Sequence, residues 1–214
     1  MLILNNLMPD PLRERLSGKT SSVWNRSIQF EAGEWIKITA PSGTGKTTLV
    51  HMIYALRKDY TGNILLNQTD IRSLATNSLA SVRQRQISII FQDLKLFPHL
   101  TARENIELKR ILQEPFCDAA QITKMAEQLG VAEILDQPAQ ICSYGEQQRI
   151  CIIRALVQPF EWLIMDEPFS HLDIANTKIA VSLIAQECRK RKAGLVITDL
   201  DDDVLFPYTQ KLHL

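Results

Sequence analysis

The chain has no apolar run long enough to cross a membrane. Its longest stretches fall well short of the ~20 residues that a spanning helix requires. The apolar start, residues 1–4, is too short for a signal peptide and lacks a basic flank. We therefore expect a soluble, cytoplasmic protein, in which any membrane role depends on a partner.

Cysteine is scarce, and charge of either sign is not in excess. The 24 basic and 24 acidic residues cancel, which argues against a nucleic-acid binder that works by general attraction. The four cysteines form no Cys-x-x-Cys pair and have no histidine at ligand spacing, which favours buried thiols in a reducing compartment. They are Cys117, Cys142, Cys151 and Cys188.

Although glycine is rare, two of the eight glycines fall in one short motif, Ala-Pro-Ser-Gly-Thr-Gly-Lys-Thr at residues 40–47. A strand at 34–39 and a helix at 46–56 give the context that a phosphate-binding loop needs. Glycines let the backbone approach phosphate oxygens, and the loop amides then cradle them. We expect phosphate contacts from Ser42, Gly43, Thr44, Gly45, Lys46, Thr47 and Thr48. A second Gly-Lys-Thr, at residues 18–20, lacks both the upstream glycine and the strand.

Two adjacent carboxylates end an apolar segment further along the chain. Residues 162–165 read as a strand, and Asp166, Glu167 and Pro168 follow it. In a phosphate-binding protein this pattern is typical of a metal-bound phosphate that water attacks. The alternative is a helix N-cap with a solvated neighbour.

Two further motifs stand between these. Gln92 follows an apolar strand at 87–91, and residues 142–149 read Cys-Ser-Tyr-Gly-Glu-Gln-Gln-Arg. Together, in this order, the motifs resemble those of the ATP-binding-cassette (ABC) ATPases over essentially the whole chain.

The resemblance implies ATP and Mg²⁺ as ligands. Lys46 would bridge the terminal phosphates, and Thr47, Gln92 and Asp166 would hold Mg²⁺. Glu167 would orient the attacking water, so that Glu167, Gln92 and Lys46 form the catalytic set. Residues 142–149 resemble the signature segment of the family. Three of them would reach the ATP held by a second cassette: Ser143, Gly145 and Gln147. Phe97 and Leu100, after Gln92, either line a groove for a membrane partner or pack in the core.

The fold implied is α/β, a RecA-like P-loop NTPase core with an antiparallel β subdomain and an inserted α-helical subdomain. We expect one nucleotide-binding domain over residues 1–214, with the core at 1–94 and 157–214 and the helical subdomain at 95–156. The sequence pattern also predicts strands at 2–8, 22–30, 64–66 and 195–198, helices at 101–112, 118–129, 143–156 and 174–191 with Gly194 helping to stop the last, and a short helix started by the aspartates at 199–203.

Within the family, the signature and the run around residues 91–106 are similar to the lipoprotein-release and macrolide-export group. That likeness implies a second cassette as partner, in a homodimer or a heterodimer, and an integral membrane permease subunit. It implies no nucleic acid, and a place at the inner face of the cell membrane through the partner.

Three departures from the family pattern leave two functions open. Tyr144 replaces the first glycine of the signature, and Thr198, or Asp199 one residue on, replaces a histidine that contacts the γ-phosphate. Pro11 stands where an aromatic residue usually stacks on adenine, and Trp24 either substitutes for it or packs under the sheet. Loss of one transition-state contact typically slows a reaction by ~10²–10³. The chain is thus either a slow transport ATPase or a degenerate cassette with a regulatory or scaffold role.

Overall fold

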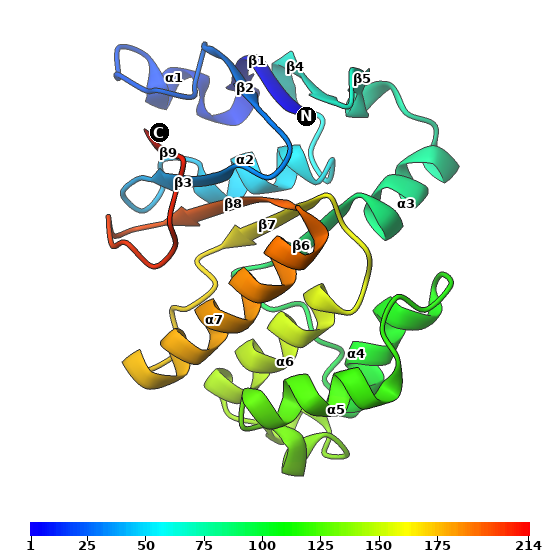
Figure 1. The fold of residues 1–214 in the computed structure, drawn as a ribbon. Coiled ribbons are helices and arrows are strands. Elements are labelled where there is room, and N and C mark those ends of the chain that lie inside the picture. The colour runs from blue at the N-terminus through cyan, green and yellow to red at the C-terminus, as the bar shows by residue number, and fades with distance from the viewer.

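A five-stranded parallel sheet forms the centre of the molecule in the computed structural model, which describes residues 1–214 (Figure 1). Its order is β6-β7-β8-β3-β9, and each neighbouring pair is parallel. The strands are β3 (Trp35–Thr39), β6 (Ile87–Ile90), β7 (Trp162–Asp166), β8 (Gly194–Asp199) and β9 (Gln210–His213). The central three are nearly continuous apolar runs because both faces of the sheet are covered.

A second, antiparallel sheet lies over one face of the first and has the order β2-β1-β4-β5. Its strands are β1 (Leu2–Pro9), β2 (Ser27–Phe30), β4 (Tyr60–Leu66) and β5 (Thr69–Asp70). Alternate side chains of the central strands point to opposite faces of the sheet and pack in two separate hydrophobic cores. Ile164 and Val196 join the core under the antiparallel sheet, whereas Leu163 and Leu195 join the core on the helical side.

Helices complete the two faces. The helix α2 (Lys46–Ile53) packs between the sheets, and α3 (Thr76–Arg85) precedes β6. The helices α4 (Ala102–Ile111), α5 (Ala119–Gln128), α6 (Tyr144–Leu156) and α7 (Ile174–Arg191) lie on the opposite side, away from the antiparallel sheet (Figure 1). The remaining short elements are η1 (Asp10–Leu12), α1 (Arg13–Leu16), η2 (Ile71–Ser73), η3 (Ala132–Ile134) and η4 (Ala139–Ile141).

Helices α4, α5 and α6 each begin with a capping box, so their starts are fixed locally. No helix of the chain combines the length and the apolar character that crossing a bilayer requires.

The structure corrects three of the expected elements. The strand expected at 22–30 begins only at Ser27, because the Ser21 hydroxyl accepts hydrogen bonds from two following amides and makes a turn. The aspartates at 199–203 start no helix. Gly194 does not end α7 but lies in β8; the helix ends at Arg191, and the following residue, Lys192, caps it with a left-handed backbone (φ 53°).

Candidate functional site

The phosphate-binding motif forms the turn between β3 and α2, at the carboxyl end of the central sheet. Gly43 and Gly45 have φ of 76° and 108°, a region that side-chain-bearing residues rarely adopt. The Thr44 hydroxyl donates a hydrogen bond of 2.7 Å to the Pro41 carbonyl and so braces the turn. The loop therefore presents its amides next to the start of α2, as an anion site requires.

Lys46 is buried and its amine is held at the centre of this turn. It donates to the carbonyls of Ala40 at 2.8 Å and Pro41 at 3.3 Å. It also forms an ion pair of 3.3 Å with Glu167, from the end of β7. The cation is thus fixed beside the loop amides by the loop's own carbonyls and by Glu167, which lies 121 positions further along the chain.

Gln92 joins the two halves of the site. Its side-chain oxygen accepts a hydrogen bond of 3.1 Å from the Thr47 hydroxyl, and its amide nitrogen donates one of 3.1 Å to Glu167. These side chains surround a cavity of about 250 Å³. The lining residues are Leu12, Arg15, Ser42, Gly43, Gly45, Lys46, Thr47, Thr48, Gln92 and Glu167.

The cavity fits a magnesium-bound nucleotide phosphate. Its only apolar lining residue is Leu12, and two cations face it. The neighbouring Thr47 hydroxyl and Gln92 carbonyl oxygen are hard oxygen donors of the kind that Mg²⁺ takes, together with phosphate oxygens and water. Most of the residues predicted for phosphate and metal binding line this cavity, whereas Thr44 and Asp166 do not.

Asp166 does not line this cavity, and Thr198 is not the counterpart of the missing histidine. Both side chains are buried, and the Thr198 hydroxyl donates a hydrogen bond of 2.6 Å to the Asp166 carboxylate. Of the two positions that the sequence left open for the missing histidine, Thr198 has its side chain turned into the sheet, and only Asp199 is partly exposed. Glu167 follows with φ of 45°, a strained conformation that directs it to Lys46.

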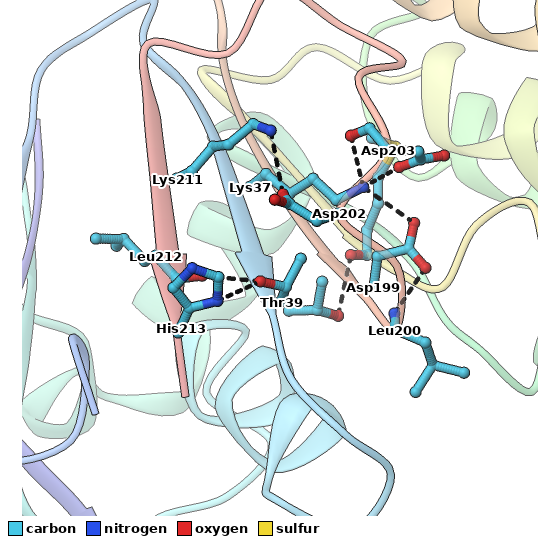
Figure 2. Close-up of polar contacts among 11 residues, drawn as sticks. Lys37, Thr39, Asp199, Leu200, Asp202, Asp203, Lys211, Leu212 and His213 are labelled. Atoms are coloured by element: carbon cyan, nitrogen blue, oxygen red, sulfur yellow. Dashed lines mark hydrogen bonds and ion pairs between the residues drawn. The ribbon is translucent and has the colours of Figure 1, made fainter. Parts of the chain in front are cut away.

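Asp199 is the last residue of β8, and its carboxylate turns towards a buried lysine (Figure 2). Lys37, on β3, has no exposed surface and lies 3.6 Å from the Asp199 carboxylate. Its amine also pairs with the Asp203 carboxylate and donates to the Asp203 carbonyl at 3.0 Å. Burial raises the pKa of Asp199, which the nearby Lys37 charge only partly offsets. The loop after β8 is therefore tied to the sheet.

The signature segment lies at the start of α6 and contributes nothing to the cavity at Lys46. Ser143 caps the helix and accepts a bond from the Glu146 amide. A Cβ added to Gly145 would lie 3.0 Å from the His171 carbonyl, which explains why a small residue is needed there. Gln147 donates to the Ala139 and Cys142 carbonyls, both at 2.9 Å, and so positions the turn before the helix.

Tyr144 points away from the helix body and is 66% exposed. Its ring lies against that of His171, with centroids 5.0 Å apart. The sequence reading missed Gln148, which is fully buried. It donates to the Glu167 carbonyl at 3.4 Å and accepts from the His171 amide at 2.9 Å, linking the signature helix to the segment after β7.

The core alternative for Phe97 is wrong, since its side chain is 57% exposed. It lines a second cavity, of about 270 Å³, with Phe91, Leu108 and Leu112. Lys109 lines it too, and burial lowers the pKa of its amine to about 8.

Neither of the two positions considered for adenine, Trp24 and Pro11, presents an aromatic face. Trp24 is only 5% exposed and belongs to the core under the antiparallel sheet, with its ring edge towards Gly45. Pro11 is exposed on η1.

The arrangement matches a known family. A model described as "ABC transporter" matches residues 23–170. The chain belongs to the ABC transporter family. A thiamine import ATP-binding protein of Haemophilus ducreyi is 33% identical over 79% of this chain and 78% of that protein. A macrolide export ATP-binding/permease protein of Bdellovibrio bacteriovorus is 32% identical over 74% of the chain, which spans only 24% of that relative.

Solved cassettes share the fold. The dimeric structure of MJ0796, a bacterial ABC transporter cassette, has a TM-score of 0.78 at 25% identity, over 92% of this chain and 88% of that one. A second dimeric structure of MJ0796, in a post-hydrolysis state with ADP and phosphate, has a TM-score of 0.77 at 26% identity, over 94% and 88%. The ABC ATPase fold is therefore confirmed, and macrolide export proteins stand among the relatives as the signature predicts.

Proposed function

We propose that the chain is the ATP-binding and ATP-hydrolysing cassette of a membrane transporter or extraction complex, and that it works as a dimer with ATP between the two cassettes. The observation that carries this is the linked set Lys46, Glu167, Gln92 and Thr47 around one polar cavity. The family match and the two dimeric neighbours support it.

In this proposal the phosphates of ATP lie in the turn formed by residues 40–48. Lys46 neutralises the terminal phosphates. Thr47 and Gln92 would hold Mg²⁺ directly, and Asp166, which does not line the cavity, would act on the ion through its water shell. Bound Mg²⁺ would offset charge on the phosphates as the terminal bond breaks. Glu167 accepts the hydrogen bond of the attacking water and aligns it, because its carboxylate is already fixed by Lys46 and Gln92.

The second half of each site comes from the other cassette. Ser143 and Gly145, at the start of α6, are placed at a helix N-terminus, where phosphate oxygens bind well. Gln147 positions the turn before α6 through its hydrogen bonds to the Ala139 and Cys142 carbonyls. The partner is a second copy or a related cassette.

A membrane permease subunit is the other partner, and it places the chain at the inner face of the cell membrane. The exposed Phe97 and the adjoining apolar cavity support this assignment. We assign the core to residues 1–94 and 157–214, and the helical subdomain, which carries the permease contact, to 95–156.

One observation favours the second candidate, a cassette that binds ATP and dimerises with little hydrolysis. The last residue of β8 is Asp199, whose carboxylate forms an ion pair with Lys37. It supplies no positive charge to a γ-phosphate, and the exposed Tyr144 adds bulk at the dimer seam.

The test is nucleotide-dependent dimerisation. Glu167→Gln removes the water-aligning carboxylate but leaves the phosphate contacts, so MgATP should convert this variant from monomer to stable dimer in light scattering. Lys46→Ala in the same background should stay monomeric, since ATP is no longer held. A Glu167→Gln chain that binds MgATP and remains monomeric would contradict the composite site.

Turnover separates the two candidates. MgATP hydrolysis that disappears in both Glu167→Gln and Lys46→Ala identifies a working ATPase. Binding and dimerisation without hydrolysis above those controls identifies the regulatory cassette.

A further inference from the structure

The phosphate cavity has a cationic wall that the phosphate-binding motif does not include. The short helix α1 (Arg13–Leu16) lies between β1 and β2 and lines the cavity through Arg15. A Cβ added to Gly43 would be 2.8 Å from Arg15 Nη2 and 3.3 Å from its Cζ. The guanidinium therefore lies directly over the backbone of the phosphate-binding turn.

Arg15 has no protein partner for its charge. It takes part in none of the ion pairs of the structure. Its neighbour Arg13, by contrast, pairs with Asp10 at 2.8 Å and also donates to the Thr61 hydroxyl. Two residues apart on a helix point to opposite sides, so pinning Arg13 to Asp10 turns Arg15 towards the cavity.

The helix that carries Arg15 is held in place by Leu16, which packs in the hydrophobic core. Leu16 is 6% exposed and packs in the core with Trp24. Leu12 and Trp24 both come within 3.0 Å of a Cβ placed on Gly45. Leu12 and Trp24 thus pack against the turn on either side of this helix in the sequence, which keeps the Arg15 guanidinium near Gly43.

We propose that Arg15 binds the terminal phosphates of the nucleotide from the side opposite to Lys46. This inference rests on the proposed function. Gly43 stands three residues before Lys46, so a phosphate that accepts from the turn at Gly43 lies within reach of both cations. A guanidinium can donate two parallel hydrogen bonds to phosphate oxygens.

The end of β8 offers no cation that could take this role. The chain has Asp199 at the end of β8, with its carboxylate engaged by Lys37 (Figure 2). No cation therefore approaches the terminal phosphate from β8. Arg15 supplies a cation from within the same chain, carried by the N-terminal segment.

The experiment measures displacement of a fluorescent ATP analogue by MgATP and by inorganic triphosphate at low protein concentration. Arg15→Ala should weaken both competitors about tenfold, the value expected when one charge-assisted hydrogen bond is lost. Arg15→Lys should fall between, because it keeps the charge and loses the paired geometry. Arg13→Ala is the matched control, with the same helix and charge change, and should leave both affinities unchanged.

Three results would overturn the proposal. In the first, Arg15→Ala binds both competitors within twofold of the unaltered chain while Lys46→Ala abolishes binding. The phosphate contact of Arg15 is then refuted, and the proposed function stands. In the second, Arg15→Ala binds MgATP more weakly but binds triphosphate with unchanged affinity, which places the guanidinium on the base or sugar of ATP instead. No binding of MgATP to the unaltered chain overturns both the function and this inference.

Chemical modification provides a readout that needs no variant. Phenylglyoxal should modify Arg15 in the unaltered chain, and MgATP should protect it while Arg13 is not protected. Equal modification of Arg15 with and without MgATP would contradict the contact even if Arg15→Ala failed to fold.

Discussion

The hydrogen bond between Thr198 and Asp166 can be removed almost without changing shape. Thr198→Val replaces the hydroxyl by a methyl group at a fully buried position. It deletes the 2.6 Å bond to the Asp166 carboxylate. Hydrogen bonds to charged groups contribute about 1.5–3 kcal/mol, and a buried carboxylate that loses its donor keeps the desolvation penalty. We expect the free energy of unfolding to fall by about 2 kcal/mol.

Urea denaturation of the two proteins measures this difference directly. Thr198→Ser keeps a hydroxyl at the same place, and it should recover most of the lost stability. MgATP turnover of Thr198→Val should fall as well, because Asp166 loses the contact that orients it towards the metal site. A valine variant within 0.5 kcal/mol of the unaltered chain, with unchanged turnover, would refute the reasoning.

Three further results are expected. Lys109→Met should stabilise the fold by about 2 kcal/mol at pH 7, because burial lowers the pKa of that amine to about 8 while its value in the unfolded chain is about 10.4. In urea denaturation this gain in stability should shrink as the pH rises from 8 to about 10.4. Lys124 is exposed, and Lys124→Met should show no such trend. Gly194→Ala should destabilise by about 1–3 kcal/mol, since the added Cβ would lie 2.5 Å from Trp162 Cε3; an unchanged melting temperature would contradict this. Asp199→His should raise MgATP turnover about tenfold by supplying the imidazole donor that the family pattern has at this place, and equal or lower turnover would count against it.

Local sequence was enough to predict the phosphate-binding turn and the carboxylates after β7. Each depends on a short run whose backbone conformation follows from its own residues, such as the left-handed glycines at 43 and 45. Glu167 meets the turn at one cavity because parallel strands present their carboxyl ends at the same edge of a sheet, whereas Asp166 does not line that cavity.

The positions that failed depend on contacts between distant segments. Thr198 and Asp199 differ by one residue, and only the pairing of β8 with β7 decides which side chain faces inward. The aspartates at 199–203 carry the composition of a helix start, but Lys37, more than 160 residues earlier, binds two of their carboxylates. No local pattern marks Lys37 as fully buried.

Sequence reasoning missed Gln148 and Arg15 for the same reason, because their roles depend on contacts between distant segments. Gln148 looks like an ordinary helix residue until α6 brings it to the backbone of Glu167 and His171. Arg15 belongs to a segment for which no helix was expected, and it gains significance only because α1 packs against the phosphate-binding turn.

Hydrolysis of MgATP by the purified chain, measured over a range of protein concentrations, tests the central claim most directly. A site completed by a second copy predicts turnover per chain that rises with concentration and then saturates. It also predicts that Lys46→Ala and Glu167→Gln both abolish the reaction. Turnover per chain that is independent of concentration, or that survives Glu167→Gln, would contradict the account.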